Sequence, residues 1–393
     1  MVEDIVVLGG ARTAIGTFGG SLAGTTPIDM ATHVASAAMQ RTGTDPETVG
    51  HVAFGHVINT EPRDMYLSRV ASLKAGIPET VPAMNVNRLC GSGAQAIVSV
   101  VQSLKLGDAE IGLAGGADCM SRSPYYLADG RWGRKMGHSS VVDAMLGALS
   151  CPFGTGHMGV TAENVAAENG IDRARQDSFA LESQRRTAAA IEDGRFEDQI
   201  APITIRERRT EREFSTDEHP RVTSMDDLAR LKPAFTADGT VTPGNSSGIN
   251  DGAAAVVLAT ASSARRNGLT PRARITGYAH AGVRPDIMGI GPVPAVRKLV
   301  GKLGIAIGDF DLIEANEAFA AQALAVNRQL DLDPGKVNPN GGAIALGHPI
   351  GATGTILVLK ALHELERTGK NTALITMCIG GGQGIALSME RMN

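Results

Sequence analysis

Short runs of apolar and β-branched residues alternate with longer amphipathic stretches along most of this chain, and this alternation is what most limits its possible folds. Runs that are apolar at every position, such as Ile111–Ala114, are typical of strands covered on both faces. The stretch after Thr26 has Asp29 at the capping-box position, and Gly93–Leu106 stops at a glycine, so both predict helices. The chain is therefore expected to be an α/β protein. We expect strands at 4–8, 51–54, 83–87, 110–114, 253–259, 273–278, 312–315, 372–378 and 384–389, and further helices at 65–75, 293–303, 317–330 and 351–368.

The texture changes between about residues 120 and 245. Glycine-rich segments such as RWGRKMG and CPFGTGHMG come first, and a charged helix is expected from Asp172 to a stop at Gly194. The mixed charges of Arg206–Glu213 are typical of an exposed face, so we expect no chemistry there. This region is expected to form a lobe inserted into the sheet core.

The two halves of the chain show the same order of features. In each half an Asn- and Gly-rich turn leads into a helix of small residues, NRLCGSGAQAI in the first and NPNGGAIALGHPIGATG in the second. A strand ending in clustered glycines follows, LAGGAD and then MCIGGGQG. This repetition indicates an ancient duplication, but it names no function.

Charge and cysteine usage exclude several classes of function. The 37 Lys and Arg residues face 41 Asp and Glu residues, a net charge of −4, so nothing points to nucleic acid or to an anionic membrane as a partner. No apolar run approaches the ~18 residues of a membrane span, and the acidic N-terminal stretch does not look like a signal peptide. The cysteines form no CxxC pair and suit thiols in a reducing compartment, so a cytoplasmic protein is expected. They are Cys90, Cys119, Cys151 and Cys378.

Cys90 lies in NRLCGSG, where an apolar strand is expected to end and a helix to begin. The positive end of the helix dipole and the free N–H groups of the first turn favour a thiolate at such a junction and lower the thiol pKa. This placement suits a nucleophile. A small buried apolar residue is an equally good interpretation of a cysteine at this position.

Three further residues lie at junctions that suit chemistry. His348 is flanked by glycines, and a neutral imidazole is a natural base for a thiol, although a lone histidine is more often structural. Cys378 ends an apolar run directly before Ile379–Gly382, whose backbone N–H groups could stabilise an oxyanion. Asn316 lies between an expected strand and helix, where a helix N-cap is the simpler explanation.

Four segments, NRLCGSG, NEAFA, GGAIALGHPIGATG and MCIGGGQG, occur in this order along the whole chain. Together they resemble the thiolases, the acetyl-CoA C-acyltransferases. A nicotinamide-binding fold is excluded, because no GxGxxG with a downstream acidic partner follows the first strand. The resemblance implies two similar βαβαβαββ halves in a five-layer αβαβα arrangement with an inserted loop domain. The N-terminal half is expected at 1–119, completed by about 249–270, the loop domain at 120–248 and the C-terminal half at 271–393.

Carried over position by position, the resemblance assigns the catalytic roles. Cys90 is the nucleophile that accepts the acyl group, and His348 is the base that activates it. Cys378 is the acid or base that moves a proton on the methyl group of the second acetyl-CoA. Asn316, through a held water, forms the first oxyanion site with His348, and the backbone N–H groups of Cys90 and Gly380 form the second.

The resemblance also assigns the substrate-binding residues. The pair His157-Met158 is similar to that of biosynthetic, short-chain thiolases, where both side chains border the acyl and pantetheine pocket. Ser247 matches a serine at the pantetheine arm, and Arg221 falls where an arginine approaches the CoA phosphates. A turn serine and a solvated surface charge are the simpler interpretations, and the His219-Pro220 before Arg221 matches no family pattern. Ala318 and Phe319 of NEAFA are also expected to bind substrate.

The implied activity is the reversible condensation of two acetyl-CoA molecules to acetoacetyl-CoA and CoA, with ping-pong kinetics. TEPRDMYLSRVAS and DAMLGALSCPF look closest to bacterial β-ketothiolases of the polyhydroxyalkanoate type, which also accept five-carbon 3-ketoacyl-CoAs. Acyl-CoAs are the expected partners, no metal or redox cofactor is implied, and a homotetramer built through the loop lobe is expected. A ketoacyl synthase using acyl carrier protein is the first alternative, and Cys378 argues against it. A non-catalytic acyl-CoA-binding relative is the second, and it should have lost a catalytic position. Cys119 and Cys151 match no role.

Overall fold

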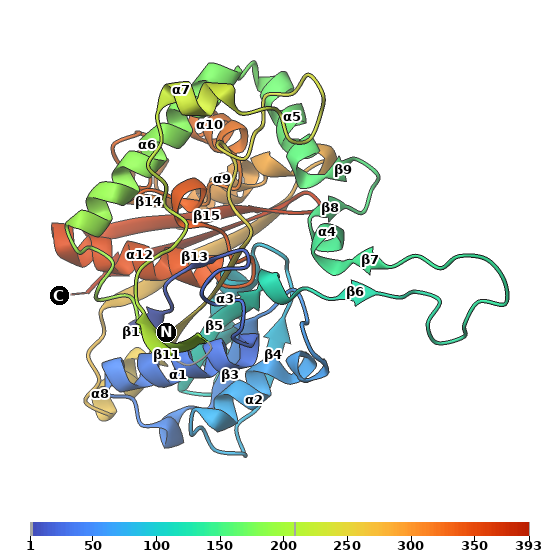
Figure 1. Cartoon of the computed structure of the whole chain (residues 1–393). Coiled ribbons are helices and arrows are strands. Elements are labelled where there is room, and N and C mark those ends of the chain that lie inside the picture. The colour runs from blue at the N-terminus through green and yellow to red at the C-terminus, as the bar shows by residue number, and fades with distance from the viewer. Residues whose placement is uncertain (1–2, 208–209, 393) are drawn as a thin grey trace.

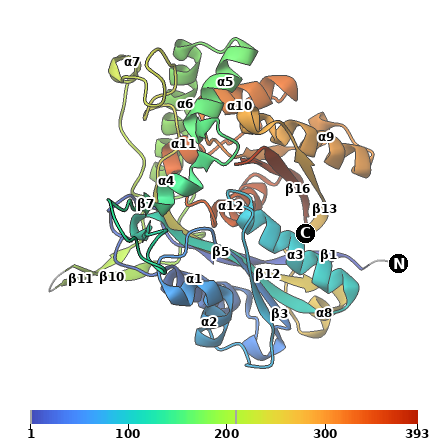
Figure 2. The same cartoon turned by 90° about the vertical axis from the view of Figure 1, so that its right-hand side faces the viewer.

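The computed structural model describes residues 3–207 and 210–392, and a mixed sheet runs through the middle of the molecule (Figures 1 and 2). The short strand β2 (Gly16–Thr17) pairs with β12 beside the main path. Along the sheet the strands follow one another as β4 (Ala83–Val86), β3 (His51–Gly55), β5 (Ile111–Cys119), β12 (Asn250–Thr260), β1 (Ile5–Arg12), β13 (Ala273–Gly282), β16 (Gln383–Arg391), β15 (Thr372–Ile379) and β14 (Leu312–Ala315).

The two halves of the sheet repeat one pairing pattern. In the first half β3 is parallel to β5, which is antiparallel to β12, which is antiparallel to β1. In the second half β14, β15, β16 and β13 follow the same sequence of directions. On its other side β3 also pairs in parallel with β4. At the corresponding place beside β14, Ile313 forms a single parallel bridge to Val337. Among the described residues, the two halves of the sheet join through two residue pairs of β1 and β13. The expected fold of two similar halves is confirmed.

Helices cover the sheet in layers that Figure 2 shows from the side. The helices α1 (Pro27–Thr42) and α2 (Leu67–Lys74) lie on the outer face of the first half, and α9 (Pro292–Leu303) and α10 (Ala320–Gln329) lie beyond the second half. Between the halves α3 (Ser92–Leu106) packs against α12 (Thr353–Thr368). α12 is buried around most of its circumference, as an inner-layer helix must be. Short helices complete the core: η1 (Pro46–Thr48), η2 (Pro62–Tyr66), α8 (Ala261–Arg266), η4 (Pro285–Ile290), η5 (Ile307–Asp309) and α11 (Ala343–Leu346).

The chain segment between β5 and β12 leaves the sheet at the end of β5. It returns at the start of β12, which is the antiparallel neighbour of β5. Figure 1 shows the segment as a projecting arm followed by helices that lie against the second half. The chain order is η3 (Met120–Arg122), β6 (Tyr125–Tyr126), β7 (Val142–Asp143), α4 (Ala144–Ala148), β8 (Ser150–Cys151), β9 (Gly156–His157), α5 (Met158–Asn169), α6 (Arg173–Glu192), β10 (Ile203–Glu207), β11 (Thr210–Phe214) and α7 (Met225–Arg230).

The expected charged strip forms the hairpin of β10 and β11, of which residues 208–209 lie outside the described part. Its pair Arg206 and Glu211 is largely exposed. The numerical limits of the three expected domains stay a prediction. In residues 3–207 and 210–392, no helix is both long enough and apolar enough to cross a membrane.

Several element boundaries differ from those expected. β5 continues through Gly115 and Gly116 to Cys119. The Gly351 peptide packs against this part of the strand: a Cβ at Gly116 would lie 2.0 Å from the carbonyl oxygen of Gly351. These glycines therefore allow close packing inside the strand rather than ending it. The helix expected from residue 317 begins only at Ala320, because the preceding Phe319 is extended and bridges to Ser246.

Candidate active site

Cys90 lies in a tight turn between β4 and α3. Leu89 before it has a φ of 45°, a left-handed conformation that costs a branched residue about 1–2 kcal/mol. Hydrogen bonds hold this turn: the Leu89 N–H donates to Asn87 Oδ1 at 3.0 Å, and the Ser92 hydroxyl donates to the Leu89 carbonyl at 2.6 Å. The surrounding turn thus fixes the position of Cys90 at the start of α3.

The Cys90 thiol is protonated in the resting protein. Burial raises its pKa to about 11, although the backbone N–H groups of Gly380 and of Cys90 itself act in the opposite direction. The expected low pKa of Cys90 is wrong, because desolvation of the thiolate outweighs the backbone hydrogen bonds that lower the pKa. A nucleophilic Cys90 therefore needs a base.

His348 has the protonation state that a base requires. Its Nδ1 lies 2.6 Å from Thr353 Oγ1, and that hydroxyl donates its own hydrogen to the Pro349 carbonyl at 2.8 Å. Since the hydroxyl hydrogen is used, His348 Nδ1 must carry the proton and Nε2 must carry the lone pair. Burial lowers the pKa of His348 to about 4, and the charge of Asp118 opposes this shift. The ring is therefore neutral at pH 7.

Asn316 lies beside this imidazole, where its side-chain amide is 3.5 Å from His348 Nε2. The N-cap interpretation of Asn316 is wrong, because α10 begins four residues later. Within the described residues Asn316 Oδ1 is buried without a hydrogen-bond partner. A buried acceptor of this kind is usually satisfied by water or a ligand.

Cys378 and Gly380 approach from the end of β15. Cys378 is buried in an apolar cluster with Met158 and Phe319. Burial, and after it the charge of Cys90, raises the pKa of Cys378. A Cβ at Gly380 would lie 3.2 Å from Met158 Cε, which places this glycine against the same cluster.

A cavity of about 300 Å³ opens in front of Cys90. Cys378, Asn316 and Gly380 do not line this cavity and lie behind residues that do. Cys378 and Gly380 lie against Met158, and Asn316 lies against His348. Cys90 is half-buried, so its sulfur is reached from this side. The expected residues on the cavity surface are Cys90, His157, Met158, Arg221, Ser247, Ala318, Phe319 and His348.

Aromatic rings form one wall of the cavity. His157 stacks on Phe235 with 4.7 Å between ring centroids, and Phe235 meets Phe319 edge-on at 6.2 Å. His157 Nδ1 accepts the N–H of Gly159 at 3.0 Å and so caps α5, while burial lowers the pKa of His157. His157 is therefore a neutral wall and capping residue.

Ser247 and Arg221 also line the cavity. The Ser247 N–H donates to the Ala318 carbonyl at 3.0 Å, which joins the loop before β12 to the NEAFA turn. Arg221 is exposed and also borders a neighbouring hollow of about 180 Å³ beside His219. Its backbone is fixed by Gln184 Oε1 at 2.9 Å.

Sequence reasoning missed part of the cavity wall. Ile350 and Ser246 adjoin recognised residues and could have been found by extending the motifs. Leu149 lies in DAMLGALSCPF, but the resemblance of that segment assigned it no role. Phe235 and Met120 come from segments without any such pattern, and only the folding of the inserted lobe brings them to Cys90. In the described part of the chain, no group of three or more His, Cys, Asp or Glu side chains is arranged to hold a metal ion.

Two family models cover nearly the whole chain: the thiolase N-terminal domain matches residues 5–262, and the thiolase C-terminal domain matches residues 269–391. The chain belongs to the thiolase family. Beta-ketothiolase BktB of Cupriavidus necator is 55% identical to this thiolase over 394 residues, with 100% of both chains covered.

Solved structures agree with this assignment. The acetyl-CoA acetyltransferase of Bacillus anthracis matches the thiolase with a TM-score of 0.97 at 46% identity, over 100% of this chain and 99% of that chain. Human mitochondrial 3-ketoacyl-CoA thiolase in complex with CoA matches with a TM-score of 0.96 at 42% identity, over 100% and 98% of the two chains. The family resemblance is confirmed, and this thiolase is an acyltransferase.

Proposed function

We propose that this thiolase catalyses the reversible condensation of two acetyl-CoA molecules to acetoacetyl-CoA and CoA, and that it also acts on five-carbon 3-ketoacyl-CoAs. The observation that carries the proposal is that Cys90 and the neutral imidazole of His348 line one apolar cavity, while a second thiol, Cys378, lies directly behind its wall against Met158 and Phe319. A cavity of about 300 Å³ is at the small end of ligand sites, which favours short acyl groups.

In the first half-reaction His348 takes the proton of Cys90 through Nε2. The thiolate attacks the thioester carbonyl of acetyl-CoA, the bond from that carbon to the CoA sulfur breaks, and CoA leaves with the proton from His348. The backbone N–H groups of Cys90 and Gly380, which donate to the sulfur in the resting protein, become donors for the acyl oxygen. Each donor of this kind contributes about 3 kcal/mol to the transition state.

In the second half-reaction Cys378 acts as a base after its own proton has passed to water, and the thiolate takes a proton from the methyl group of a second acetyl-CoA. The carbanion attacks the acetyl carbon on Cys90, a carbon–carbon bond forms, and the bond to the Cys90 sulfur breaks. The proton on Cys378 then passes to the Cys90 thiolate, which returns Cys378 to its thiolate. His348 and a water held by Asn316 face the enolate oxygen in this proposal, and the unpaired Oδ1 of Asn316 supports it.

The electrostatics of the two thiols favour this order of events. Burial gives Cys378 a raised pKa, so its thiolate is a strong base suited to a weak carbon acid. The charge of Cys90 is the second cause of that raised pKa. Once acetylated, Cys90 cannot ionise, so no negative charge on its sulfur opposes the ionisation of Cys378 in the acetyl-enzyme.

The remaining parts of the proposal concern partners and location. CoA serves as substrate and product, and the steps above use no metal or redox cofactor. A homotetramer is supported by the exposed apolar side chains of the projecting arm, among them Trp132 at 91% and Met136 at 89% exposure. Four cysteines present as free thiols support a cytoplasmic location.

Initial-rate kinetics test the proposed reaction. We expect the purified protein to cleave acetoacetyl-CoA with CoA and to give parallel double-reciprocal lines, as a covalent intermediate requires. Cys90→Ser, which changes one atom, is expected to lose the activity while it keeps its fold. Intersecting lines, or thiolysis that survives in Cys90→Ser, would contradict the acyl-cysteine route.

A further inference from the structure

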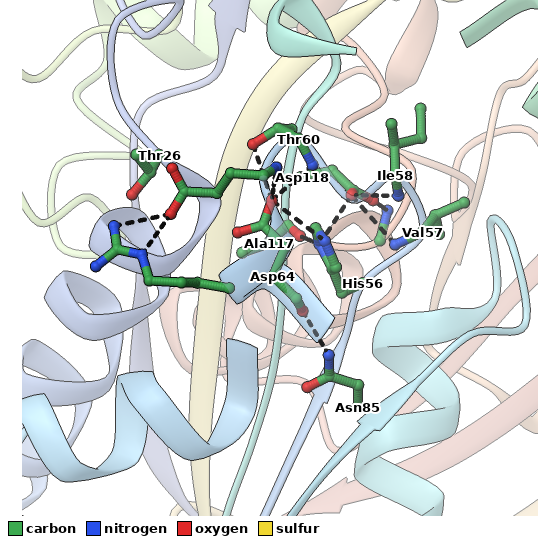
Figure 3. Close-up of polar contacts among 12 residues, drawn as sticks. Thr26, His56, Val57, Ile58, Thr60, Asp64, Asn85, Ala117 and Asp118 are labelled. Atoms are coloured by element: carbon green, nitrogen blue, oxygen red, sulfur yellow. Dashed lines mark hydrogen bonds and ion pairs between the residues drawn. The ribbon is translucent and has the colours of Figure 1, made fainter. Parts of the chain in front are cut away.

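A buried group of ionisable residues, His56, Asp64 and Asp118, is not among the residues that line the cavity. Figure 3 shows these three side chains close together. His56 follows β3, Asp64 belongs to η2, and Asp118 lies near the end of β5. Their exposed fractions are 3%, 0% and 0%. Buried charges are costly unless they are paired and hydrogen-bonded, so the contacts of this group need an explanation.

Asp118 binds backbone from both sides of the active site. Its Oδ2 accepts the N–H of Gly351 at 2.7 Å, and its Oδ1 accepts the N–H groups of Val57 at 3.2 Å and Ile58 at 3.1 Å. Gly351 lies three residues after His348. Ile350, between them, lines the cavity and packs with Ile58 against Cys90. One carboxylate thus joins the His348 turn to the loop after β3.

Close packing also confines the Gly351 peptide. A Cβ on Gly351 would lie 2.4 Å from Asp118 Oδ2, so a side chain there would displace the carboxylate. Added Cβ atoms at Gly55, Gly93 and Gly116 would come within 2.7, 2.9 and 2.0 Å of the Gly351 carbonyl oxygen. The turn therefore has one tightly defined position, and Asp118 supplies the hydrogen bond that fixes it.

His56 lies between the carboxylates of Asp118 and Asp64. Its Nδ1 lies 2.8 Å from the Ala117 carbonyl and 3.1 Å from Asp118 Oδ1, and both are acceptors, so Nδ1 carries a proton. Its Nε2 lies 3.9 Å from Asp64 Oδ2. Burial alone would lower the pKa of His56, but Asp118 first and then the backbone contact and Asp64 raise it above its usual value.

We propose that Asp118 is a positioning residue for the reaction: it holds the turn of His348 in place and, with His56 held protonated between Asp118 and Asp64, sets the electrostatic field on the imidazole. The inference rests on the proposed role of His348 as base. Asp118 acts on both His348 and Cys90 and raises the pKa of each. Among the described residues, Asp64 and Asp118 are the ionised groups that act on His56.

Removal of the Asp118 charge and removal of the His56 charge are expected to shift the pH dependence of kcat/KM in thiolysis in opposite directions. Asp118→Asn removes the negative charge, so the pKa of His348 falls and the acidic limb of the profile moves to lower pH. His56→Gln removes the positive charge that opposes Asp118, so the acidic limb moves to higher pH. In Asp118→Asn we also expect kcat to fall about tenfold to hundredfold, from misplacement of His348, with little change in KM because Asp118 does not line the cavity.

Protein kept at pH 7 is diluted briefly into assay buffers that extend well below pH 4, because the acidic limb of the wild type is expected near the His348 pKa of about 4. The brief exposure limits acid unfolding during the assay. Glu47→Gln, which removes an exposed carboxylate on η1, is the control and should shift neither limb. An acidic limb that stays in place or moves upward in Asp118→Asn, or stays in place or moves downward in His56→Gln, overturns the inference. If Asp118→Asn does not fold, the upward shift in His56→Gln decides alone. A wild-type protein without thiolysis would instead refute the proposed function.

Discussion

Met158→Ala should shift the thiolase towards longer substrates. Met158 is only 6% exposed and lies between Cys378, Phe319 and the cavity in front of Cys90. Truncation to alanine opens the apolar wall where additional acyl carbons would lie. Each methylene buried there contributes ~0.8 kcal/mol, about fourfold in kcat/KM, so a six-carbon substrate gains about 15-fold over a four-carbon one.

The assay compares kcat/KM in thiolysis for six-carbon and four-carbon 3-ketoacyl-CoAs, and the quantity of interest is their ratio. Losing a buried methionine also costs about 2–5 kcal/mol of folding free energy. Met30→Ala, in the buried face of α1, is the matched control: it loses the same side chain far from the cavity and should leave the ratio unchanged. An unchanged ratio in a folded Met158→Ala variant would refute the placement of the acyl chain against Met158.

Further predictions concern the thiols, the base and the fold. Cys378→Ser should still form the acetyl-enzyme while condensation and thiolysis fall steeply, because Cys378 moves a proton only in the second half-reaction. The first half-reaction is measured as acetylation of the protein by acetyl-CoA, and the full reaction as thiolysis. Equal loss of both would contradict this. Acetylation of Cys90 should move the pH midpoint of Cys378 alkylation downward, since it removes the charge that helps raise the pKa of Cys378; a midpoint that does not move would refute the coupling of the two thiols. Thr353→Val should lower kcat about tenfold with KM unchanged, because His348 Nδ1 loses the acceptor that fixes its tautomer; a wild-type kcat would show that the tautomer is set elsewhere. Buried His219 and His348 have pKa values lowered to about 4, below an unfolded value of ~6.5, so each contributes stability that is present above pH ~6.5 and is lost as pH falls towards 4, by up to ~1.4 kcal/mol per pH unit; a urea midpoint at pH 5 equal to that at pH 7 would contradict this.

The sequence predicted the fold well where apolar patterning alone decides the structure. The runs at 111–114 and 372–378 have no polar face, and both form strands buried on both sides. Boundaries failed where contacts distant in sequence decide. Gly115 and Gly116 looked like a strand end, yet they lie inside β5 because the Gly351 peptide packs against them. The late start of α10 has the same origin, since the bridge between Ser246 and Phe319 holds the NEAFA turn extended.

The site followed the same division. Residues in glycine-rich turns, such as Cys90, His348 and Gly380, could be identified from short motifs, because the close approach of backbone leaves a mark on the sequence. Phe235, in the inserted lobe, left no such mark. Asp118 lies in LAGGAD, whose glycines are visible in the sequence, but that pattern assigned no role to the aspartate. The raised pKa of Cys90 was missed because burial, which no local pattern reveals, outweighs the backbone hydrogen bonds to its sulfur.

The central claim is that Cys90 carries the acyl group, and mass spectrometry of the protein after incubation with acetyl-CoA tests it most directly. The intact chain should gain one acetyl group, and proteolysis should place it on the peptide that contains Cys90. Excess CoA should remove the acetyl group again, since the first half-reaction is reversible. Acetylation found on Cys378, or a chain that gains no acetyl group while it still catalyses thiolysis, would contradict the account.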